Sequence, residues 1–265
     1  MQEVVCDTMV WYHIYGEVEL QKLSEINCFI STMSNIDDFY GSKKVIDDFI
    51  EVQNAIRSST KYSRFLIPEH PFEYVNNENL LPQFRKQNPE NQKGIDFCVQ
   101  IANVSEISED NKTIIEREFK NRQDRIGQFV SFINDHSKKR RELIGDLKRN
   151  NSFDKKNYRK IDRSVNNRDF IKFTIEVWSK LSQTKFCEEI DWKDLELFEN
   201  VTNEFFLELE LSQKKVDVND INDWFQLAYV NSKRKYLTKE KNWIRRIVSC
   251  GMEKYLMDYS IKLID

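Results

Sequence analysis

The chain has 265 residues, of which 40% are hydrophobic, 32% charged and 12% aromatic, so it can bury a core and is not disordered as a whole. Its 6 glycines and 4 prolines are too few for a turn-rich β-sandwich or β-barrel and favour a helix-rich chain. The formal net charge of −3 excludes an overall basic protein, so any surface that binds nucleic acid must be local.

The first elements predicted from the sequence alternate between strand and helix. Residues 3–6 form an apolar run typical of a short buried strand, which ends at Asp7. Thr8 is the expected N-cap of a helix that begins near Met9. Further along we expect a helix over 17–25, a second strand over 27–32, and a helix from an N-cap at Ser34-Asn35 toward Ala55 with Gly41 as its weak point.

The middle of the chain is predicted to be almost entirely helical. All four prolines and many asparagines fall within 68–93, which predicts an irregular loop or linker there. Helical spacing returns over 94–148 and predicts a charged amphipathic helix that runs to about Leu147. Residues 138–160 hold ten basic and three acidic side chains, whereas 188–210 hold nine acids and one lysine. These two segments can pair with each other, or each can face solvent.

The last stretch returns to an α/β pattern. Residues 217–230 place Ile221, Trp224 and Phe225 on one helical face. A short strand is expected over 235–238, followed by an amphipathic helix over 241–248.

Acidic side chains stand at the points where these terminal elements change. Asp7 follows the first strand, Asp220 and Asp223 lie three residues apart in a first helical turn, and Glu240 follows the last strand. If the strands are parallel neighbours, these carboxylates converge on one edge of the sheet. Clustered carboxylates repel one another unless a divalent cation lies among them.

The same motifs resemble the PIN-like nuclease family. Residues 6–11, CDTMVW, are similar to its opening D-T-N-V-W, with Met9 in place of Asn. Residues 32–39, TMSNIDDF, are similar to its S-x-x-x-x-x-E-L segment and put Asp38, with Asp37 as the fallback, at the second acid. Asn219-Asp220 followed by Asp223 resembles the third acidic motif, and LTKE followed by Trp243 resembles the closing T-x-D-x-x-F, with Glu240 in place of Asp.

The resemblance implies an α/β fold with a parallel sheet flanked by helices and a large, mostly helical insertion. The PIN-like domain would be discontinuous, over 1–58 and 200–265, and the insertion would cover 59–199, including the Pro/Asn-rich linker at 68–93. It also implies a Mg²⁺ or Mn²⁺ site that hydrolyses phosphodiesters, in RNA rather than DNA.

The same hypothesis gives each acid a role. Asp7 is the central metal ligand, and Asp220 and Asp223 complete the metal shell. Asp38 and Glu240 orient metal-bound water, and the Thr238 hydroxyl reaches a phosphate or a ligand carboxylate. Each of these acids can instead be a helix cap or a solvated surface group without a catalytic role.

The basic segment is the candidate RNA-binding surface. The residues that we assign to it are Lys138, Lys139, Arg140, Arg141, Lys148, Arg149, Lys155 and Lys156. A charge run of this kind is also typical of a solvated helix face.

Three functions therefore compete. The first is a metal-dependent endoribonuclease, such as a toxin or defence effector, with a protein inhibitor or a second copy of the chain as further candidate partners. The second is a catalytically degenerate scaffold that binds protein or RNA, and the third is a nucleic-acid binder that does not cleave. We expect a cytoplasmic protein, because its five cysteines are scattered and its N-terminus lacks the basic-then-apolar pattern of a signal peptide. We expect no membrane partner, because no apolar run approaches the ~20 residues of a membrane span.

Overall fold

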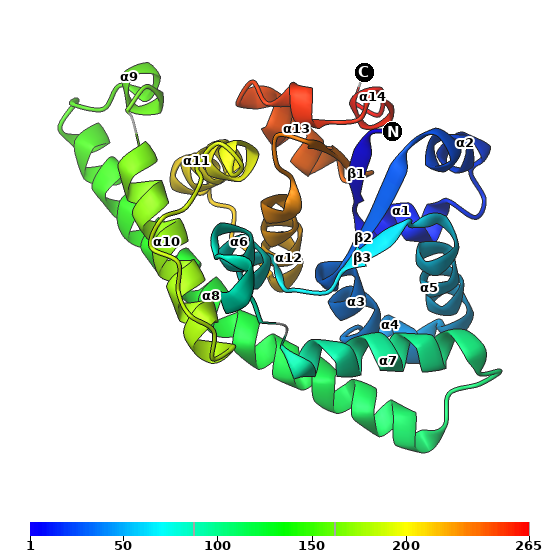
Figure 1. Cartoon of the computed structure of the whole chain (residues 1–265). Coiled ribbons are helices and arrows are strands. Elements are labelled where there is room, and N and C mark those ends of the chain that lie inside the picture. Colours follow the sequence, from blue (N-terminus) through cyan, green and yellow to red (C-terminus); the bar gives the residue numbers. More distant parts are fainter. Residues whose placement is uncertain (87, 162, 265) are drawn as a thin grey trace.

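The fold is built on a parallel sheet of four short strands. A computed structural model describes residues 1–86, 88–161 and 163–264. Their sheet has the order β3-β2-β1-β4, and every neighbouring pair is parallel (Figure 1). The strands are β1 (Glu3–Cys6), β2 (Cys28–Thr32), β3 (Phe65–Ile67) and β4 (Arg234–Leu237). The predicted mixed α/β class with a parallel sheet flanked by helices is confirmed.

Both faces of the sheet are covered by helices, which is why β1 is apolar on both sides. Val4 and Phe29 belong to one buried cluster, whereas Val5 and Ile30 belong to the other. Alternate residues of a strand point to opposite faces, so the two clusters mark the two sides of the central layer.

The first cluster is formed mainly by the N-terminal third of the chain. Its helices pack in pairs, α1 on α5, α3 on α7, and α5 on α7. Their bounds are α1 (Thr8–His13), α2 (Val18–Ile26), α3 (Met33–Tyr40), α4 (Lys44–Asp47), α5 (Phe49–Tyr62) and α7 (Pro89–Asn103).

The second cluster combines helices from the middle and the end of the chain. α6 packs on α10, and α11 packs on both α10 and α13. The elements on this side are α6 (Pro71–Asn79), α10 (Ser164–Leu181), α11 (Glu196–Leu211), α12 (Val218–Gln226), η2 (Leu227–Tyr229), α13 (Lys241–Ser249) and η3 (Glu253–Tyr255). The remaining short elements are η1 (Pro82–Phe84), α9 (Lys155–Arg159) and α14 (Asp258–Ile261).

One long helix crosses the whole molecule. α8 (Glu109–Arg149) has 41 residues and so is ~60 Å long. Its Ile115 lies in the first cluster and its Ile133 in the second, so α8 joins the two sides (Figure 1). The predicted end of this helix near Leu147 is confirmed.

The prediction of an irregular linker over 68–93 is wrong. The segment contains α6, η1 and the start of α7, and each begins with a proline at its first position, at Pro71, Pro82 and Pro89. Proline suits this position because the first helical N–H groups have no intrahelical acceptor. The buried Asn91 side chain donates to the Pro68 carbonyl at 2.8 Å and to Glu73 Oε2 at 2.9 Å, so it supports structure rather than a loop.

Other local predictions also need correction. The N-cap of α1 is Asp7 rather than Thr8. The helix expected from Ser34-Asn35 toward Ala55 has Thr32 as its N-cap and divides at Gly41 and again at Asp48, into α3, α4 and α5. β3 was not predicted, and it pairs with β2, so the predicted domain boundary at residue 58 precedes a strand of the central sheet.

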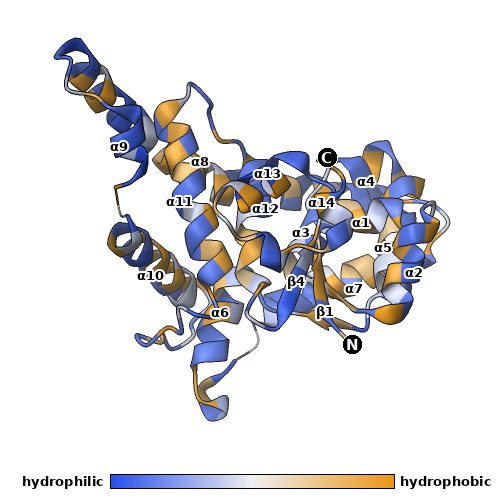
Figure 2. Cartoon of the chain, turned by 90° about the horizontal axis from the view of Figure 1, so that it is seen from above, coloured by the Kyte–Doolittle hydropathy of each residue, from blue (hydrophilic) through white to orange (hydrophobic). Residues whose placement is uncertain are grey.

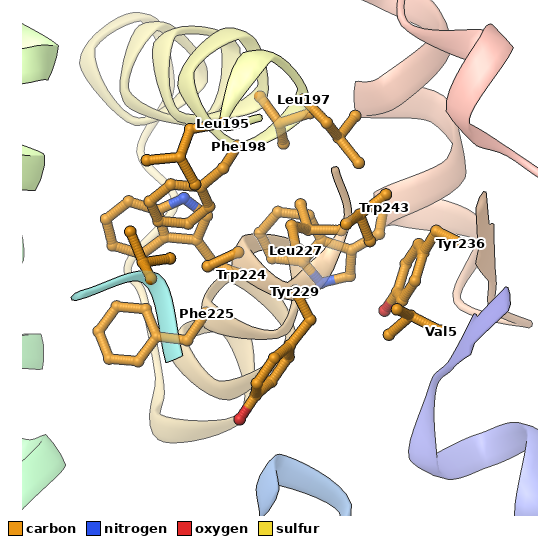
Figure 3. Close-up of a cluster of buried hydrophobic side chains, with 14 of the residues drawn as sticks. Val5, Leu195, Leu197, Phe198, Trp224, Phe225, Leu227, Tyr229, Tyr236 and Trp243 are labelled. Atoms are coloured by element: carbon orange, nitrogen blue, oxygen red, sulfur yellow. The ribbon is translucent and has the colours of Figure 1, made fainter. Parts of the chain in front are cut away.

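The second cluster is dominated by aromatic rings (Figure 3). Trp224 is fully buried, its ring centroid lies 5.5 Å from that of Phe198, and its indole N–H donates to Thr202 Oγ1 at 2.9 Å. Phe198 also meets Phe72 at 5.9 Å. The middle of the chain therefore shares a core with the C-terminal part.

None of the helices in the described part of the chain combines the length and apolar composition that a bilayer span requires. Figure 2 agrees with this, because hydrophilic and hydrophobic residues alternate along the long helices.

The shared core predicts the effect of truncating one ring. Phe198→Ala should lower the free energy of unfolding by about 3–5 kcal/mol, because it leaves a cavity among buried rings. The measurement is urea unfolding followed by tryptophan fluorescence and by far-UV circular dichroism. The matched control is Phe173→Ala, which removes a 59% exposed ring and should change stability by less than about 0.5 kcal/mol. Two separate transitions, only one of them shifted, would contradict a shared core.

Candidate active site

The strand order reverses its direction at β1. The chain passes from β1 to β2 and β3 on one side, whereas β4 lies on the other side of β1. This reversal makes the carboxyl ends of β1 and β4 a switch point, the place where open parallel sheets bind ligands. Asp7 follows β1 directly, and Thr238 and Glu240 follow β4.

Asp7 is held at this point by both ends of the chain. Its residue exposure is 2%, and its Oδ2 accepts a hydrogen bond of 2.5 Å from the Thr238 hydroxyl. Its Oδ1 accepts from the Met9 N–H at 3.4 Å, which makes Asp7 the N-cap of α1. The Thr238 hydroxyl accepts in turn from the Glu240 N–H at 3.0 Å, so one hydroxyl orders two of the predicted residues.

Asp38 enters the site from α3. Its Oδ2 accepts from the Thr8 hydroxyl at 2.7 Å, and its Oδ1 forms an ion pair with Arg122 of α8. Arg122 also donates to the Asp37 carbonyl at 2.9 Å. A Cβ at Gly41 would lie 2.9 Å from Arg122 Cδ, so the glycine leaves the space through which this arginine reaches the site.

Asp223 and Glu240 complete the group. Asp223 projects from α12, and its Oδ2 accepts from the Trp243 indole N–H at 3.1 Å. Glu240 is the N-cap residue of α13. Both carboxyl groups are partly exposed, whereas Asp7 beneath them is buried.

The acids perturb one another. Burial, followed by the charges of Glu240 and Asp38, raises the pKa of Asp7 to about 7, although the Thr238 hydrogen bond opposes this. Burial, and then the charges of Asp7, Asp38 and Glu240, raise the pKa of Asp223 well above its ordinary value. Four carboxyl groups from four elements thus share one electrostatic environment, with Arg122 as the cation paired to Asp38.

Tyr236 adds a polar group that sequence reasoning missed. Among the described atoms, its buried hydroxyl has no hydrogen-bond partner. Burial, and then the charges of Asp7 and Asp223, raise the pKa of Tyr236. Tyr236 lies on β4 and Thr238 directly follows this strand, two residues further along the chain, so both point to the same side of the sheet. The alternation of the strand was the only signal that could have found this hydroxyl.

Two amides hold the backbone at the end of β1. The Asn35 side chain donates to the Cys6 carbonyl at 3.2 Å and accepts from the Trp11 indole at 3.2 Å. The Gln226 side chain donates to the same carbonyl at 2.9 Å. Neither amide was predicted, and neither belongs to a recognisable spacing.

Asp220 does not join the group, although it is three residues from Asp223. Its carboxylate accepts from the Asp217 N–H in a capping box and lies 3.1 Å from Lys214 Nζ. Asp37, the fallback for Asp38, lies 3.0 Å from His70 Nδ1. The structure therefore brings together Asp7, Asp38, Asp223, Thr238 and Glu240, and turns Asp220 to another partner.

The side chains that the structure brings together fit a hard divalent cation, because each of them offers a carboxylate or hydroxyl oxygen as a ligand atom. Within residues 1–86, 88–161 and 163–264, however, no three acidic, histidine or cysteine side chains are arranged to hold a metal ion as they stand. Mg²⁺ commonly uses only one or two carboxylates together with water and substrate phosphate. Asp7 and Asp223, whose pKa values are raised by burial and then by neighbouring charge, are the residues that gain most from a cation.

The predicted RNA-binding residues lie away from the acids. They occupy the distal end of α8 and α9, at the periphery of both views (Figures 1 and 2). Arg141 donates to the Leu209 carbonyl at 2.7 Å and is partly buried, and Arg149 pairs with Asp146. The others are exposed: Lys138, Lys139, Arg140, Lys148, Lys155 and Lys156. Acids of α11 pair elsewhere, Glu199 with Arg168 and Glu208 with Arg246.

Comparisons with known proteins add no assignment. The chain matches no family model, no curated protein and no solved structure.

The raised pKa of Asp7 predicts a pH-dependent stability. Between about pH 4 and 7 the folded protein keeps a proton that the unfolded chain has lost, so this residue lowers stability as pH rises through that window. Asp7→Asn should therefore raise the free energy of unfolding by ~1–4 kcal/mol at about pH 8 and much less near pH 4.

The measurement is thermal and urea unfolding of the metal-free protein in EDTA at both pH values. Asp169→Asn, which neutralises an exposed carboxyl group on α10, should leave the pH dependence unchanged. Equal stabilisation by Asp7→Asn at both pH values would show that Asp7 does not titrate in this range.

Proposed function

We propose that this chain is a Mg²⁺- or Mn²⁺-dependent phosphodiester hydrolase with a PIN-like active site, acting on RNA rather than DNA. One observation carries the proposal: the buried Asp7 lies at the switch point of the sheet, where burial and the charges of Glu240 and Asp38 raise its pKa, and where its own charge adds to burial in raising the pKa of Asp223. Neighbouring carboxylates repel one another and so lower the stability of the folded chain. A divalent cation bound among them would remove this repulsion.

The chain's own residues divide the work. Asp7 and Asp223 would hold the metal, which supplies charge neutralisation for the phosphate oxygens and a more acidic water. The Thr238 hydroxyl keeps Asp7 oriented at 2.5 Å. Glu240, at the start of α13, and Asp38, held by Thr8, would accept hydrogen bonds from the attacking water.

Arg122 supports the same assignment. It comes from the helical middle of the chain and forms an ion pair with Asp38, and its side chain is 11% exposed. A guanidinium beside the acids could bind a phosphate of the substrate as well as Asp38. α8 would then connect the site to the exposed basic residues at its distal end.

A degenerate scaffold is the second candidate function. Asp38 is already paired with Arg122, and Met9 contributes only its backbone N–H to Asp7. A protein of this kind would bind no metal at the acids and would use the helical region to bind protein or RNA.

Metal binding separates the two candidates. Mg²⁺ or Mn²⁺ should raise the melting temperature of the wild type by several degrees, and Asp7→Asn and Asp223→Asn should abolish the rise. Asp220→Asn should keep most of it, because Asp220 serves a capping box and Lys214 rather than the site. The same variants should be compared in cleavage of single-stranded RNA.

A melting temperature insensitive to metal, together with no cleavage, would favour the scaffold. A loss of the metal effect in Asp220→Asn but not in Asp223→Asn would overturn the ligand assignment.

The exposed lysines of α8 predict a salt-sensitive contact with RNA. Lys138→Glu with Lys139→Glu should weaken RNA binding and reduce the slope of log affinity against log salt by about 1–2, because each phosphate contact releases counterions. Fluorescence anisotropy over a salt series measures this. Lys22→Glu with Lys93→Glu changes the net charge equally at exposed sites outside the basic segment and serves as the control. Equal effects of both pairs would argue against a local RNA surface.

A further inference from the structure

A second candidate binding site lies between α8, α10 and α11, away from the acids. It is a cavity of about 390 Å³, within the range of small-ligand sites. Its walls combine aromatic rings with charged groups, namely Phe132, Phe170, Phe206, Arg140, Arg163 and Glu210. The predicted function uses none of these residues except Arg140.

Two rings of the aromatic wall are parallel, and one of them packs on the buried core. The rings of Phe132 and Phe170 are nearly parallel, with centroids 6.4 Å apart and an interplanar angle of 7°. Phe170 also stacks on the buried Trp224 at 6.0 Å and meets Phe206 edge-on at 5.3 Å. Phe132 itself is 53% exposed, so one rigid ring face at the mouth of the cavity is available for stacking.

The polar groups that line the cavity differ in burial. Glu210 is 7% exposed, and its Oε2 accepts from the Tyr158 hydroxyl at 2.7 Å and lies 3.8 Å from Arg163 Nη2. Arg163 also donates to the carbonyls of Ile161 and Tyr158. The inner end of the cavity thus offers a carboxylate acceptor whose charge is balanced by Arg163.

Arg140 differs from Arg163 because no described carboxylate forms an ion pair with it. It is exposed, and among the residues that the structure describes no carboxylate lies within ion-pair distance of its guanidinium. The mouth of the cavity is therefore cationic, whereas its walls are aromatic and its inner end accepts hydrogen bonds.

We propose that this cavity binds one unpaired nucleotide, with the base against Phe132, an N–H edge of the base toward Glu210, and the phosphate on Arg140. Bases stack on aromatic rings in proteins that bind single strands, and arginine binds phosphate through its fork of N–H groups. The inference rests on the proposed function in one respect: we expect the bound nucleotide to belong to an RNA strand that the acidic site would cut. A free nucleotide has the same recognition chemistry and is distinguished below.

The experiment measures binding without cleavage. A fluorescently labelled single-stranded RNA of about 8 nucleotides is titrated with the protein in EDTA, followed by anisotropy, and GMP is tested as a competitor. Phe132→Ala and Arg140→Gln should each weaken binding about tenfold. Phe173→Ala removes a 59% exposed ring of α10, and Arg117→Gln removes an exposed guanidinium from the other half of α8, so each should stay within about twofold of the wild type.

The outcomes are distinct. Competition by GMP that is lost in Phe132→Ala would support the site with a free nucleotide as its ligand, and binding of the strand alone would support a strand. Equal effects of Phe132→Ala and Phe173→Ala, or no binding of either probe, would overturn the proposal. Asp7→Asn should bind normally in EDTA, so failure of the metal site and failure of this cavity can be told apart.

Discussion

The candidate site depends on one buried hydrogen bond, between the Thr238 hydroxyl and the Asp7 carboxylate. It joins residues 231 positions apart in the sequence and lies between β1 and β4, which pair from Glu3–Arg234 to Cys6–Leu237. Because the strands are parallel, this register brings both carboxyl ends to the same edge of the sheet. The bond compensates only part of the burial of Asp7, whose pKa is raised to about 7. The other acids gather around a group that is already destabilised.

The helices determine which acids take part. α12 presents Asp223 toward the site because Ile221, Trp224 and Phe225 are buried in the aromatic cluster, which sets the rotation of the helix. Asp220 lies one turn earlier, where the capping box and Lys214 hold it. Similarly, the Thr8 hydroxyl and Arg122 orient Asp38. The site is therefore assembled from helix rotations that the hydrophobic core imposes.

The long helix α8 connects the acids to the basic residues in the middle of the chain. Its N-terminal half contacts the first cluster, Arg122 reaches the acids, and its distal half carries Phe132, Lys138 and Arg140. The helix α8 therefore contacts both the metal site and the nucleotide cavity that we propose. A strand bound along α8 could reach both.

Much of the fold follows from local pattern. We could predict the strands at both ends from their apolar residues and the long charged helix from its periodicity. We could also predict that acids follow the strands, because residue type and spacing are local properties of the sequence. The short β3 could not, since three residues before Pro68 carry no periodicity. The helices within 68–93 were missed because proline starts a helix as readily as it breaks one, and only packing decides between the two.

The residues around Asp7 show the same division. Sequence alone determined that carboxylates follow β1 and β4 and lie on the helix over 218–226, although only Asp220 is in its first turn. Only the tertiary structure decided that Asp223 rather than Asp220 faces Asp7, that Arg122 enters from the middle of the chain, and that Tyr236 leaves a buried hydroxyl beside the acids. The reason is physical: side-chain type and spacing are written along the chain, whereas helix rotation and ion-pair choice depend on packing between segments distant in sequence.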